Sequence, residues 1–354
     1  MLSRSVRIPS FFHIGKGTLT SIRNILDVEG VDHSKCLVIS GKNFTKITAD
    51  VVKKSIDGEI NQVSIVNSGV DSIYEVQRKI REFSPSLVIG VGGGKVLDVT
   101  KYCSYKINNT PFLAIPTVLS NDGISSPVAV VQTEQGINSL GTNPPVGIII
   151  DTEIVRNAPL ETILSGVGDL ISNISAVEDW NLAGMYAGEK VDKFAEILAR
   201  NSAEGFMQLV GSNQCDMIPL ANRDDILTLL AESLIQSGIA MSLAGSSRPC
   251  SGSEHLISHA LDGMLNFAKP HGIQVGLATI FTNAIRGKEV SNLISLYKKI
   301  GFPTRPEDMG ISTSTFADAI KNAPNTRKGR FTILNLVSEK EVQEALKIAY
   351  GYGT

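Results

Sequence analysis

Three of the five histidines in this chain lie within seventeen residues, at His255, His259 and His271. His255 and His259 are four residues apart in SGSEHLISHALD, so on a helix they lie on the same face. His271 begins the next predicted helix, in KPHGIQVG. Imidazoles from two adjacent helices can bind one divalent ion, and neutral imidazole suits zinc, nickel or iron. The cluster therefore predicts a metal site in this part of the chain.

A third metal ligand has to come from another segment, and Asp169 is the candidate. It follows a Gly-x-Gly turn in SGVGD, residues 165–169, at the start of an apolar helical segment. The alternative is a structural role, because an aspartate at that position can cap the first turn of the helix. His259 could likewise be a hydrogen-bonded histidine of the protein core.

A glycine triplet is the second chemical signal. Gly92, Gly93 and Gly94 follow an aliphatic run, residues 87–91, that is typical of a strand buried on both faces of a parallel sheet. Glycines there let the backbone approach a ligand, and the next helix directs its free N–H groups at the same place, which favours a phosphate. The triplet does not match the G-x-G-x-x-G fingerprint, so it does not predict that topology. The alternative is a tight turn without a ligand.

A polar loop follows the next predicted strand, residues 112–115. Its residues 117–127 carry hydroxyls and one carboxylate, beyond the end of a strand where open α/β sheets bind ligands. A solvated turn is the simpler alternative. Residues 41–43, Gly-Lys-Asn, follow an earlier strand and are a second place where a nucleotide could be bound.

Strands and helices alternate through the first half of the chain, which predicts a parallel sheet covered by helices. The predicted strands are 35–40, 62–66, 87–91, 112–115 and 146–151, with helices at 44–56 and 72–83 and an edge strand within 7–17. From residue 159 onward apolar residues recur at three and four spacing, in segments 170–186, 224–243, 254–267, 275–285 and 289–300. We therefore expect an α/β nucleotide-binding domain over residues 1–160 and an all-α metal- and substrate-binding domain over 161–354.

The composition excludes some classes of partner. The 354 residues have a formal charge of −2 with dispersed basic residues, which argues against nucleic acid or an anionic membrane surface as partner. No apolar run reaches the roughly eighteen residues of a membrane span, and the N-terminus lacks an apolar signal core. We expect a cytoplasmic protein without a membrane span.

Five motifs, taken together, resemble those of the sn-glycerol-1-phosphate dehydrogenases, a branch of the iron-containing alcohol dehydrogenase and dehydroquinate synthase superfamily. In chain order they are GGGKVLD, PTVLSNDGISSP, SGVGDLISN, SGSEHLISHALD and HGIQVG. The resemblance implies a dehydroquinate synthase-like fold, with an α/β domain, an all-α domain and the active site between them. It also implies a homodimer or larger assembly.

The resemblance implies roles for individual residues as well. A catalytic divalent metal, zinc in some relatives and nickel or iron in others, would bind Asp169, His255 and His271. The catalytic residues Asp122 and His259 would face the substrate. NAD or NADP would contact Gly93, Gly94, Lys95, Asp98, Thr117, Ser120 and Ser126.

One departure from the superfamily pattern concerns the metal. The iron-dependent alcohol dehydrogenases carry a histidine four residues after the ligand aspartate, whereas this chain has Asn173 there. Three protein ligands would remain, which leaves open positions for substrate and water, as in a catalytic site. The departure favours the zinc or nickel branches over the iron branch.

The implied activity is the reversible reduction of dihydroxyacetone phosphate to sn-glycerol 1-phosphate by NAD(P)H. Alternatives on the same scaffold are a glycerol or other polyol dehydrogenase and a dehydroquinate synthase-like cyclase that uses NAD transiently. A regulator that binds metal and nucleotide without turnover is a further alternative, which the open metal position argues against. NADH and NADPH remain equally open, because Lys42 tolerates a 2′-phosphate and no acidic residue lies beside it.

A phosphorylated substrate needs a positive group near the metal, and Arg248 is the candidate. It lies in SSRPCSGS, residues 246–253, shortly before His255. An arginine with serines at a helix N-terminus can bind an anion. The alternative is a surface arginine beside serines that only cap the helix.

Overall fold

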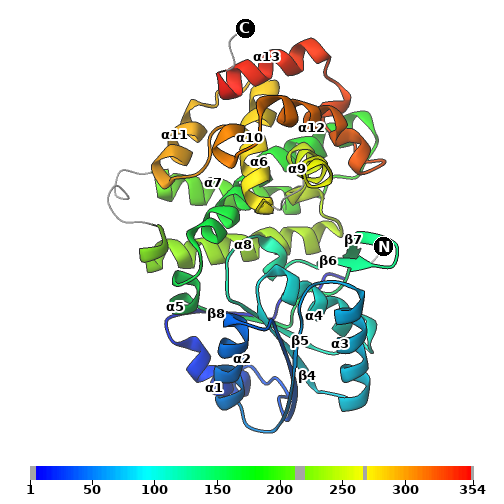
Figure 1. The fold of residues 1–354 in the computed structure, drawn as a ribbon, viewed down its shortest axis with the longest axis vertical. Helices are drawn as coiled ribbons and strands as arrows, with labels where there is room; N and C mark the ends of the chain where they lie inside the picture. The colour runs from blue at the N-terminus through cyan, green and yellow to red at the C-terminus, as the bar shows by residue number, and fades with distance from the viewer. Residues whose placement is uncertain (1–4, 212–219, 266–268, 352–354) are drawn as a thin grey trace. The chain divides into compact units, whose positions relative to one another are not determined.

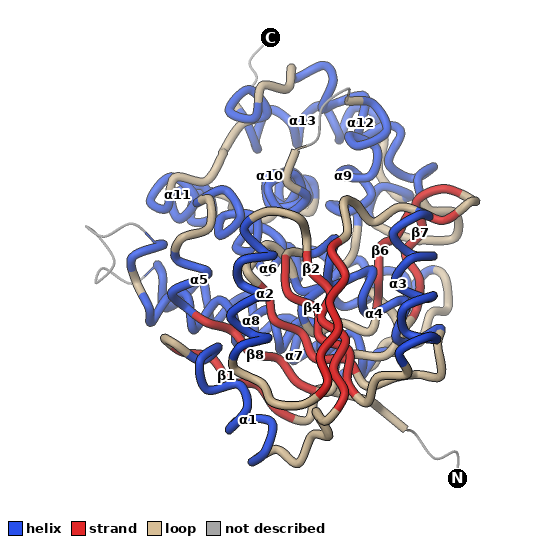
Figure 2. Tube along the Cα trace, turned by 60° about the horizontal axis from the view of Figure 1, so that its bottom comes forward, coloured by secondary structure: helices blue, strands red, loops and turns tan. Residues whose placement is uncertain are grey.

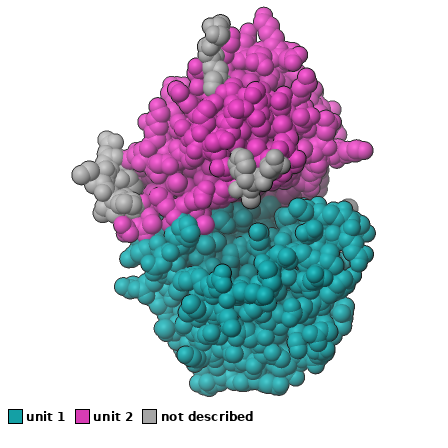
Figure 3. Space-filling view, viewed as in Figure 1, with its two compact units in different colours: residues 1–159, 224–242 teal, residues 160–223, 243–354 magenta. Residues whose placement is uncertain are grey.

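The computed structural model describes residues 5–211, 220–265 and 269–351. The chain forms two compact units, coloured separately in Figure 3. Unit 1 comprises Met1–Pro159 and Asp224–Ser242, and unit 2 comprises Leu160–Arg223 and Leu243–Thr354.

Unit 1 is built on a six-stranded sheet in which all neighbouring strands are parallel, in the order β1-β8-β5-β4-β2-β3. The strands are β1 Phe11–Gly15, β2 Lys35–Ser40, β3 Glu59–Ser64, β4 Leu87–Gly92, β5 Phe112–Pro116 and β8 Gly147–Asp151. Every residue of β4, β5 and β8 is buried, as their unbroken aliphatic sequences predict for strands with both faces covered.

Helices cover both faces of this sheet (Figure 2). On one face α1 (Ile22–Val28) and α2 (Phe44–Lys54) pack with Val38 and Ile89, and on the other α3 (Val70–Phe83) and α4 (Gly94–Lys106) pack with Leu37, Ile39 and Val88. Successive strand residues point to opposite faces, so each strand supplies both cores. The short helix α5 (Thr152–Arg156) follows β8.

The predicted α/β architecture is confirmed, with two differences in detail. The strand expected at 62–66 is β3, which begins at Glu59 with polar residues. At the edge of the sheet β3 has a single neighbour, so it needs no continuous apolar run. An antiparallel hairpin, β6 (Val128–Thr133) and β7 (Gly136–Gly141), was not predicted.

The long helix α8 (Asp224–Ala244) belongs by sequence to the predicted helical half, but nearly all of it groups with unit 1. The Ser125 hydroxyl donates to the backbone carbonyls of Leu234 and Ile235 at 3.2 and 3.1 Å. A Cβ at Gly238 would lie 2.0 Å from that hydroxyl oxygen, so glycine permits the contact. By length and composition α8 could cross a membrane, but 61% of its most apolar window is buried, as in a core helix.

Unit 2 is helical throughout its described residues. Its helices are α6 Leu160–Tyr186, α7 Lys193–Gly211, α9 Ser253–Met264, α10 His271–Ile285, α11 Ser291–Ile300, α12 Thr313–Thr326 and α13 Glu339–Tyr350 (Figure 1). Helix α10 is the centre of the unit, buried along most of its length and packed by α6, α9 and α13.

Glycines let α6 and α10 approach to backbone contact. A Cβ at Gly168 of α6 would lie 2.1 Å from the carbonyl oxygen of Gly272 on α10. A Cβ at Gly272 would lie 1.8 Å from the carbonyl oxygen of Ser165, and one at Gly276 would lie 2.7 Å from Cα of Gly168. No side chain fits between these backbones, so the crossing requires glycine.

This crossing yields a test of stability. We expect Gly272→Ala to lower the free energy of unfolding by about 1–3 kcal/mol, because the methyl group forces two backbones apart. The control is Gly205→Ala on α7, where an added Cβ meets no atom within 4 Å. That change should stabilise by up to about 1 kcal/mol, through helix propensity. Equal thermal midpoints for the two variants would contradict the packing argument.

Candidate functional site

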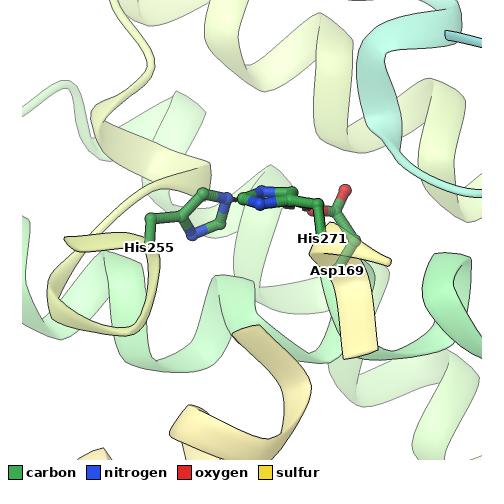
Figure 4. A group of neighbouring side chains, drawn as sticks. All are labelled: Asp169, His255 and His271. Carbon is green, nitrogen blue, oxygen red and sulfur yellow. Dashed lines mark ion pairs between the residues drawn. The ribbon is translucent and has the colours of Figure 1, made fainter. Parts of the chain in front are cut away.

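The structure brings together the three predicted metal ligands, which lie on three helices of unit 2. Asp169 comes from α6, His255 from the first turn of α9, and His271 is the first residue of α10 (Figure 4). Oδ1 of Asp169 lies 3.8 Å from Nε2 of His255 and 3.8 Å from Nε2 of His271. Their ligand atoms all lie within 4.8 Å of one another.

These positions fit a divalent metal ion. Two ligand atoms on bonds of about 2.1 Å can stand up to about twice that distance apart, so separations of 3.8 Å admit an ion between them. One carboxylate and two imidazoles leave coordination positions open, as catalytic zinc sites do. Asn173 donates from its amide nitrogen to the carbonyl of Ala199 and the hydroxyl of Ser202, both on α7.

A buried glutamate orients His255. Nδ1 of His255 lies 2.9 Å from Oε1 of Glu254, so the ring donates its proton there and directs the Nε2 lone pair at Asp169. Burial raises the pKa of Glu254, but hydrogen bonds from His255 and Ser175 outweigh that effect and hold the pKa below its usual value. Glu254 therefore remains an anion, which is the form that accepts the imidazole proton.

A neutral hydrogen-bond chain orients His271. The Ser258 hydroxyl donates to Oε1 of Gln274 at 3.2 Å, so at 3.0 Å it accepts the proton of Nδ1 of His271. Gln274 is fixed in turn, since its amide nitrogen donates to Asp262 at 2.8 Å. Desolvation, followed by the charges of the other two histidines, lowers the pKa of His271 well below its usual value. The ring is neutral with Nε2 unprotonated, as a metal ligand must be.

The N-terminus of α9 is occupied by protein carboxylates. The amide of Gly252 donates to Glu254 at 2.6 Å, and the amide of Ser253 donates to Asp179 at 2.6 Å. Arg286 pairs with Asp179 at 2.6 Å and stabilises this buried negative charge. These amides are therefore not available to an anion from solution.

Arg248 does not fit the phosphate role predicted for it. The residue is 5% exposed, its Nε and Nη2 bind the Glu189 carboxylate, and its Nη1 donates to the carbonyl of Phe331 at 2.8 Å. The guanidinium is thus committed to protein groups on all three nitrogens.

His259 lies one helical turn beyond His255, as the i, i+4 spacing predicted. Its ring stacks on that of His271, with centroids 6.2 Å apart and planes at 20°. The ring is exposed, yet surrounding protein desolvates it, and with the charges of His255, Arg327 and Arg330 lowers its pKa to about 4. At neutral pH the imidazole is therefore neutral and can accept a hydrogen bond.

The predicted cofactor residues all lie in unit 1, on two neighbouring segments. From β2 the chain passes to β3, at one edge of the sheet, whereas from β4 it passes to β5, which lies on the other side of β4. The strands β2 and β4 therefore flank a topological switch point. Ligands of open α/β sheets bind at such a point, outside the carboxyl ends of the strands. Ser40 pairs in register with Val91, which places the Gly41 and Gly92 turns side by side.

The N-terminus of α4 is a suitable place for a phosphate. Gly93 is its N-cap, Gly94 is its first residue, and no side-chain hydrogen bond caps this end. A Cβ at Gly94 would meet only the Asn121 amide, at 3.6 Å. Lys95 is exposed on the first turn, and burial raises the pKa of Asp98, on the same helix, to about 6 against the lowering effect of Lys101.

The polar loop after β5 is anchored by tertiary contacts. Thr117 begins it by donating its amide to the carbonyl of Gly92 at 3.1 Å. The buried Lys101 ammonium of α4 donates to the carbonyls of Gly123 and Val128 at 2.7 and 2.8 Å. Asp122 accepts a hydrogen bond from Ser237 of α8 at 2.8 Å. These tertiary contacts fix the position of the loop, so it is not a solvated turn.

Ser120 and Ser126 lie in the same loop, half-buried and buried respectively. The Ser126 hydroxyl is 3.4 Å from the carbonyl of Val128.

Sequence reasoning missed the residues that support the ligands. Glu254 directly precedes His255 in the motif SGSEHLISHALD. An acidic residue next to a predicted metal ligand was therefore the signal that could have identified it. Ser258 and Gln274 each lie three residues from a histidine of the cluster, which on a helix places them close to it. No neighbouring motif marked Arg327 and Arg330, whose charges help to lower the pKa of His259.

Comparisons with known proteins place the chain in a family. Residues 13–159 match the family model described as iron-containing alcohol dehydrogenase. A glycerol-1-phosphate dehydrogenase [NAD(P)+] of Pyrococcus abyssi is 35% identical over 339 residues, covering 95% of this chain and 96% of the relative. One of Saccharolobus solfataricus is 39% identical over 300 residues, 84% of each chain.

Solved structures agree on the fold. The crystal structure of glycerol dehydrogenase from Schizosaccharomyces pombe superposes with a TM-score of 0.72, at 22% identity, over 99% of this chain and 91% of that one. The family resemblance read from the five motifs is confirmed, and the protein is an oxidoreductase that uses NAD(P) and a metal ion. The chain belongs to the glycerol-1-phosphate dehydrogenases, within the iron-containing alcohol dehydrogenase family.

Proposed function

We propose that this protein catalyses the reversible reduction of dihydroxyacetone phosphate to sn-glycerol 1-phosphate, with NAD(P)H as hydride donor. The observation that carries the proposal is the three-ligand site of Asp169, His255 and His271 in a chain whose relatives, similar over nearly their full length, are named glycerol-1-phosphate dehydrogenases. When a ketone accepts hydride, negative charge develops on its oxygen and has to be stabilised. A metal site with open coordination positions can provide that stabilisation.

In this proposal Asp169, His255 and His271 hold the ion, which when bound acts as a Lewis acid toward the ketone oxygen. Glu254 and Ser258 act indirectly, because each fixes one imidazole by accepting its Nδ1 proton. Such hydrogen bonds keep the ring orientation and the tautomer that metal binding requires.

His259 and Asp122 are the proposed substrate-facing groups. The His259 ring is exposed and neutral beside His271, so it can hold or relay a proton of the substrate hydroxyl, directly or through water. Asp122 has an orienting hydrogen bond from Ser237, and its carboxylate can accept one from a substrate hydroxyl.

The proposed cofactor site uses Gly93 and Gly94 for the pyrophosphate, with Lys95, Asp98, Thr117, Ser120 and Ser126 around the rest of the nucleotide. Helix N-terminal amides favour the pyrophosphate charge. Lys42, beside the switch point, is compatible with a 2′-phosphate, which supports use of both NAD and NADP. Family membership further supports a cytoplasmic homo-oligomer.

The direct test is substrate profiling by NAD(P)H absorbance after reconstitution with zinc and, separately, with nickel. We expect oxidation of NADH and NADPH with dihydroxyacetone phosphate, and far slower oxidation with dihydroxyacetone. Preference for dihydroxyacetone, or for glycerol in the reverse direction, would identify a polyol dehydrogenase. A product formed without net change in NADH would identify a cyclase.

The ligand assignment predicts graded losses of metal affinity. Asp169→Asn and His271→Ala each leave two good ligands and should lose the ion on dialysis, as measured by atomic emission. Glu254→Gln keeps all three ligands but weakens the acceptor of the His255 proton, so we expect its dissociation constant for zinc to rise about 10–100-fold. The control is Glu204→Gln, an exposed glutamate of α7. Full metal content in Asp169→Asn would exclude the assignment.

The cofactor assignment is tested by Gly94→Val. The added atoms have room in the protein, since the nearest neighbour of a Cβ is at 3.6 Å, but they occupy the place where a pyrophosphate would contact the backbone. We expect a folded variant whose dissociation constant for NADPH rises at least tenfold, or by about 1.4 kcal/mol. Unchanged affinity by fluorescence titration would move the nucleotide away from this turn.

A further inference from the structure

We propose that Arg327 and Arg330, rather than Arg248, bind the phosphate group of the substrate, in an anion site that they form with Ser247 beside α9. The inference rests on the proposed function, in that the phosphorylated ligand is taken to be a triose phosphate. The site belongs entirely to unit 2, which also carries the candidate metal ligands.

The Ser247 hydroxyl accepts hydrogen bonds from the guanidinium groups of both Arg327 and Arg330. Nη2 of Arg330 donates to the Ser247 hydroxyl at 2.9 Å, and Nη1 of Arg327 donates to the same oxygen at 3.3 Å. Arg330 is held further by the carbonyl of Ser251, at 3.0 Å from its Nη1. A guanidinium has five N–H donors, so each group keeps donors for an oxyanion.

Two charges of this cluster have no direct ion-pair partner among the described protein groups. Arg248, Arg327 and Arg330 lie together, but the carboxylate of Glu189 binds Arg248. Within the described part of the chain, neither Arg327 nor Arg330 has a carboxylate at ion-pair distance. Glu189 and Glu254 act on Arg330 from a distance, so a phosphate oxyanion would supply the direct charge partner that the two guanidinium groups lack.

Burial makes these charges costly without an anion. Arg330 is 8% exposed, and a buried charge without a counter-ion is unfavourable. Burial, and then the charges of Arg327 and Arg248, lowers the pKa of Arg330 to about 9. The buried Arg286 behaves differently, because it has Asp179 as partner at 2.6 Å. Arg286 thus has a direct carboxylate partner, whereas within the described residues Arg327 and Arg330 have none at ion-pair distance.

The cluster lies close to the metal ligands. Ser247 and Ser251 precede α9, which carries His255 in its first turn and His259 in its second. The Thr326 hydroxyl at the end of α12 is 3.5 Å from the carbonyl of Leu256, which fixes the arginine segment beside α9. The charges of Arg327 and Arg330 also lower the pKa of His259, which places the cluster near the metal ligands.

The test compares charge-removing variants in one segment. Arg327→Gln removes a half-buried charge of the cluster, and Lys328→Gln removes an exposed charge next to it. Arg330→Lys retains the charge but not the two-pronged geometry, and serves as the second variant should loss of the Arg327 charge affect folding. Circular dichroism and thermal midpoints establish that each variant is folded.

With the zinc-loaded protein, we expect Arg327→Gln to lower kcat/KM for dihydroxyacetone phosphate about 100-fold while changing that for dihydroxyacetone less than about threefold. Arg330→Lys should show the same selectivity with a smaller loss, and Lys328→Gln should resemble the wild type. Equal losses on the two substrates, or no loss in either arginine variant, would overturn the assignment.

Binding of inorganic phosphate by calorimetry gives a readout independent of turnover. We expect Arg327→Gln to weaken it at least tenfold and Lys328→Gln to leave it unchanged. If the wild type fails to reduce dihydroxyacetone phosphate while Arg327→Gln still loses phosphate binding, the proposed function is wrong and the anion site stands. If the wild type reduces it and phosphate binding is the same in all variants, the anion site is wrong and the function stands.

Discussion

The backbone contact between α6 and α10 is the constraint on which the candidate metal site depends. Gly168 precedes Asp169, and Gly272 follows His271, so the two glycines that touch are immediate neighbours of two ligands. A side chain at either glycine would separate the helices by the size of a methyl group, and the ligand atoms, now 3.8 Å apart, would separate with them. The packing of α6 against α10 therefore determines the separation of the metal ligands.

Buried charge is treated in two ways in unit 2. Glu254 and Asp179 are completely buried, but each accepts several hydrogen bonds, and Arg286 supplies the compensating charge. Such a satisfied network fixes side-chain positions and so holds His255 in place. Arg327 and Arg330 of the same unit have no carboxylate at ion-pair distance among the residues that the structure describes, and in our proposal the phosphate of the substrate supplies that charge.

The sequence predicted what local patterns encode. Strand 35–40 appears unchanged as β2, and Asp169, His255 and His271 meet as expected, because a buried aliphatic run and helical spacing are properties of neighbouring residues. What was missed depends on contacts between distant segments. Helix α8 reads as part of the helical half, yet Ser125, more than a hundred residues earlier, binds its carbonyls. Arg248 looked suited to phosphate because nothing local shows that Glu189 binds it.

Glycine inside helices explains how both units reach such close contacts. A glycine in a helix interior costs about 0.5–1 kcal/mol relative to alanine, and α6, α8 and α10 each carry at least one where another segment approaches closely. This loss of helix stability is offset only where the glycine permits a contact that a larger residue would prevent. At Gly168 and Gly272 it is the convergence of metal ligands, and at Gly238 it is the anchoring of the loop that carries Asp122. Gly168, Gly238 and Gly272 therefore lie where the proposed reactive groups are positioned.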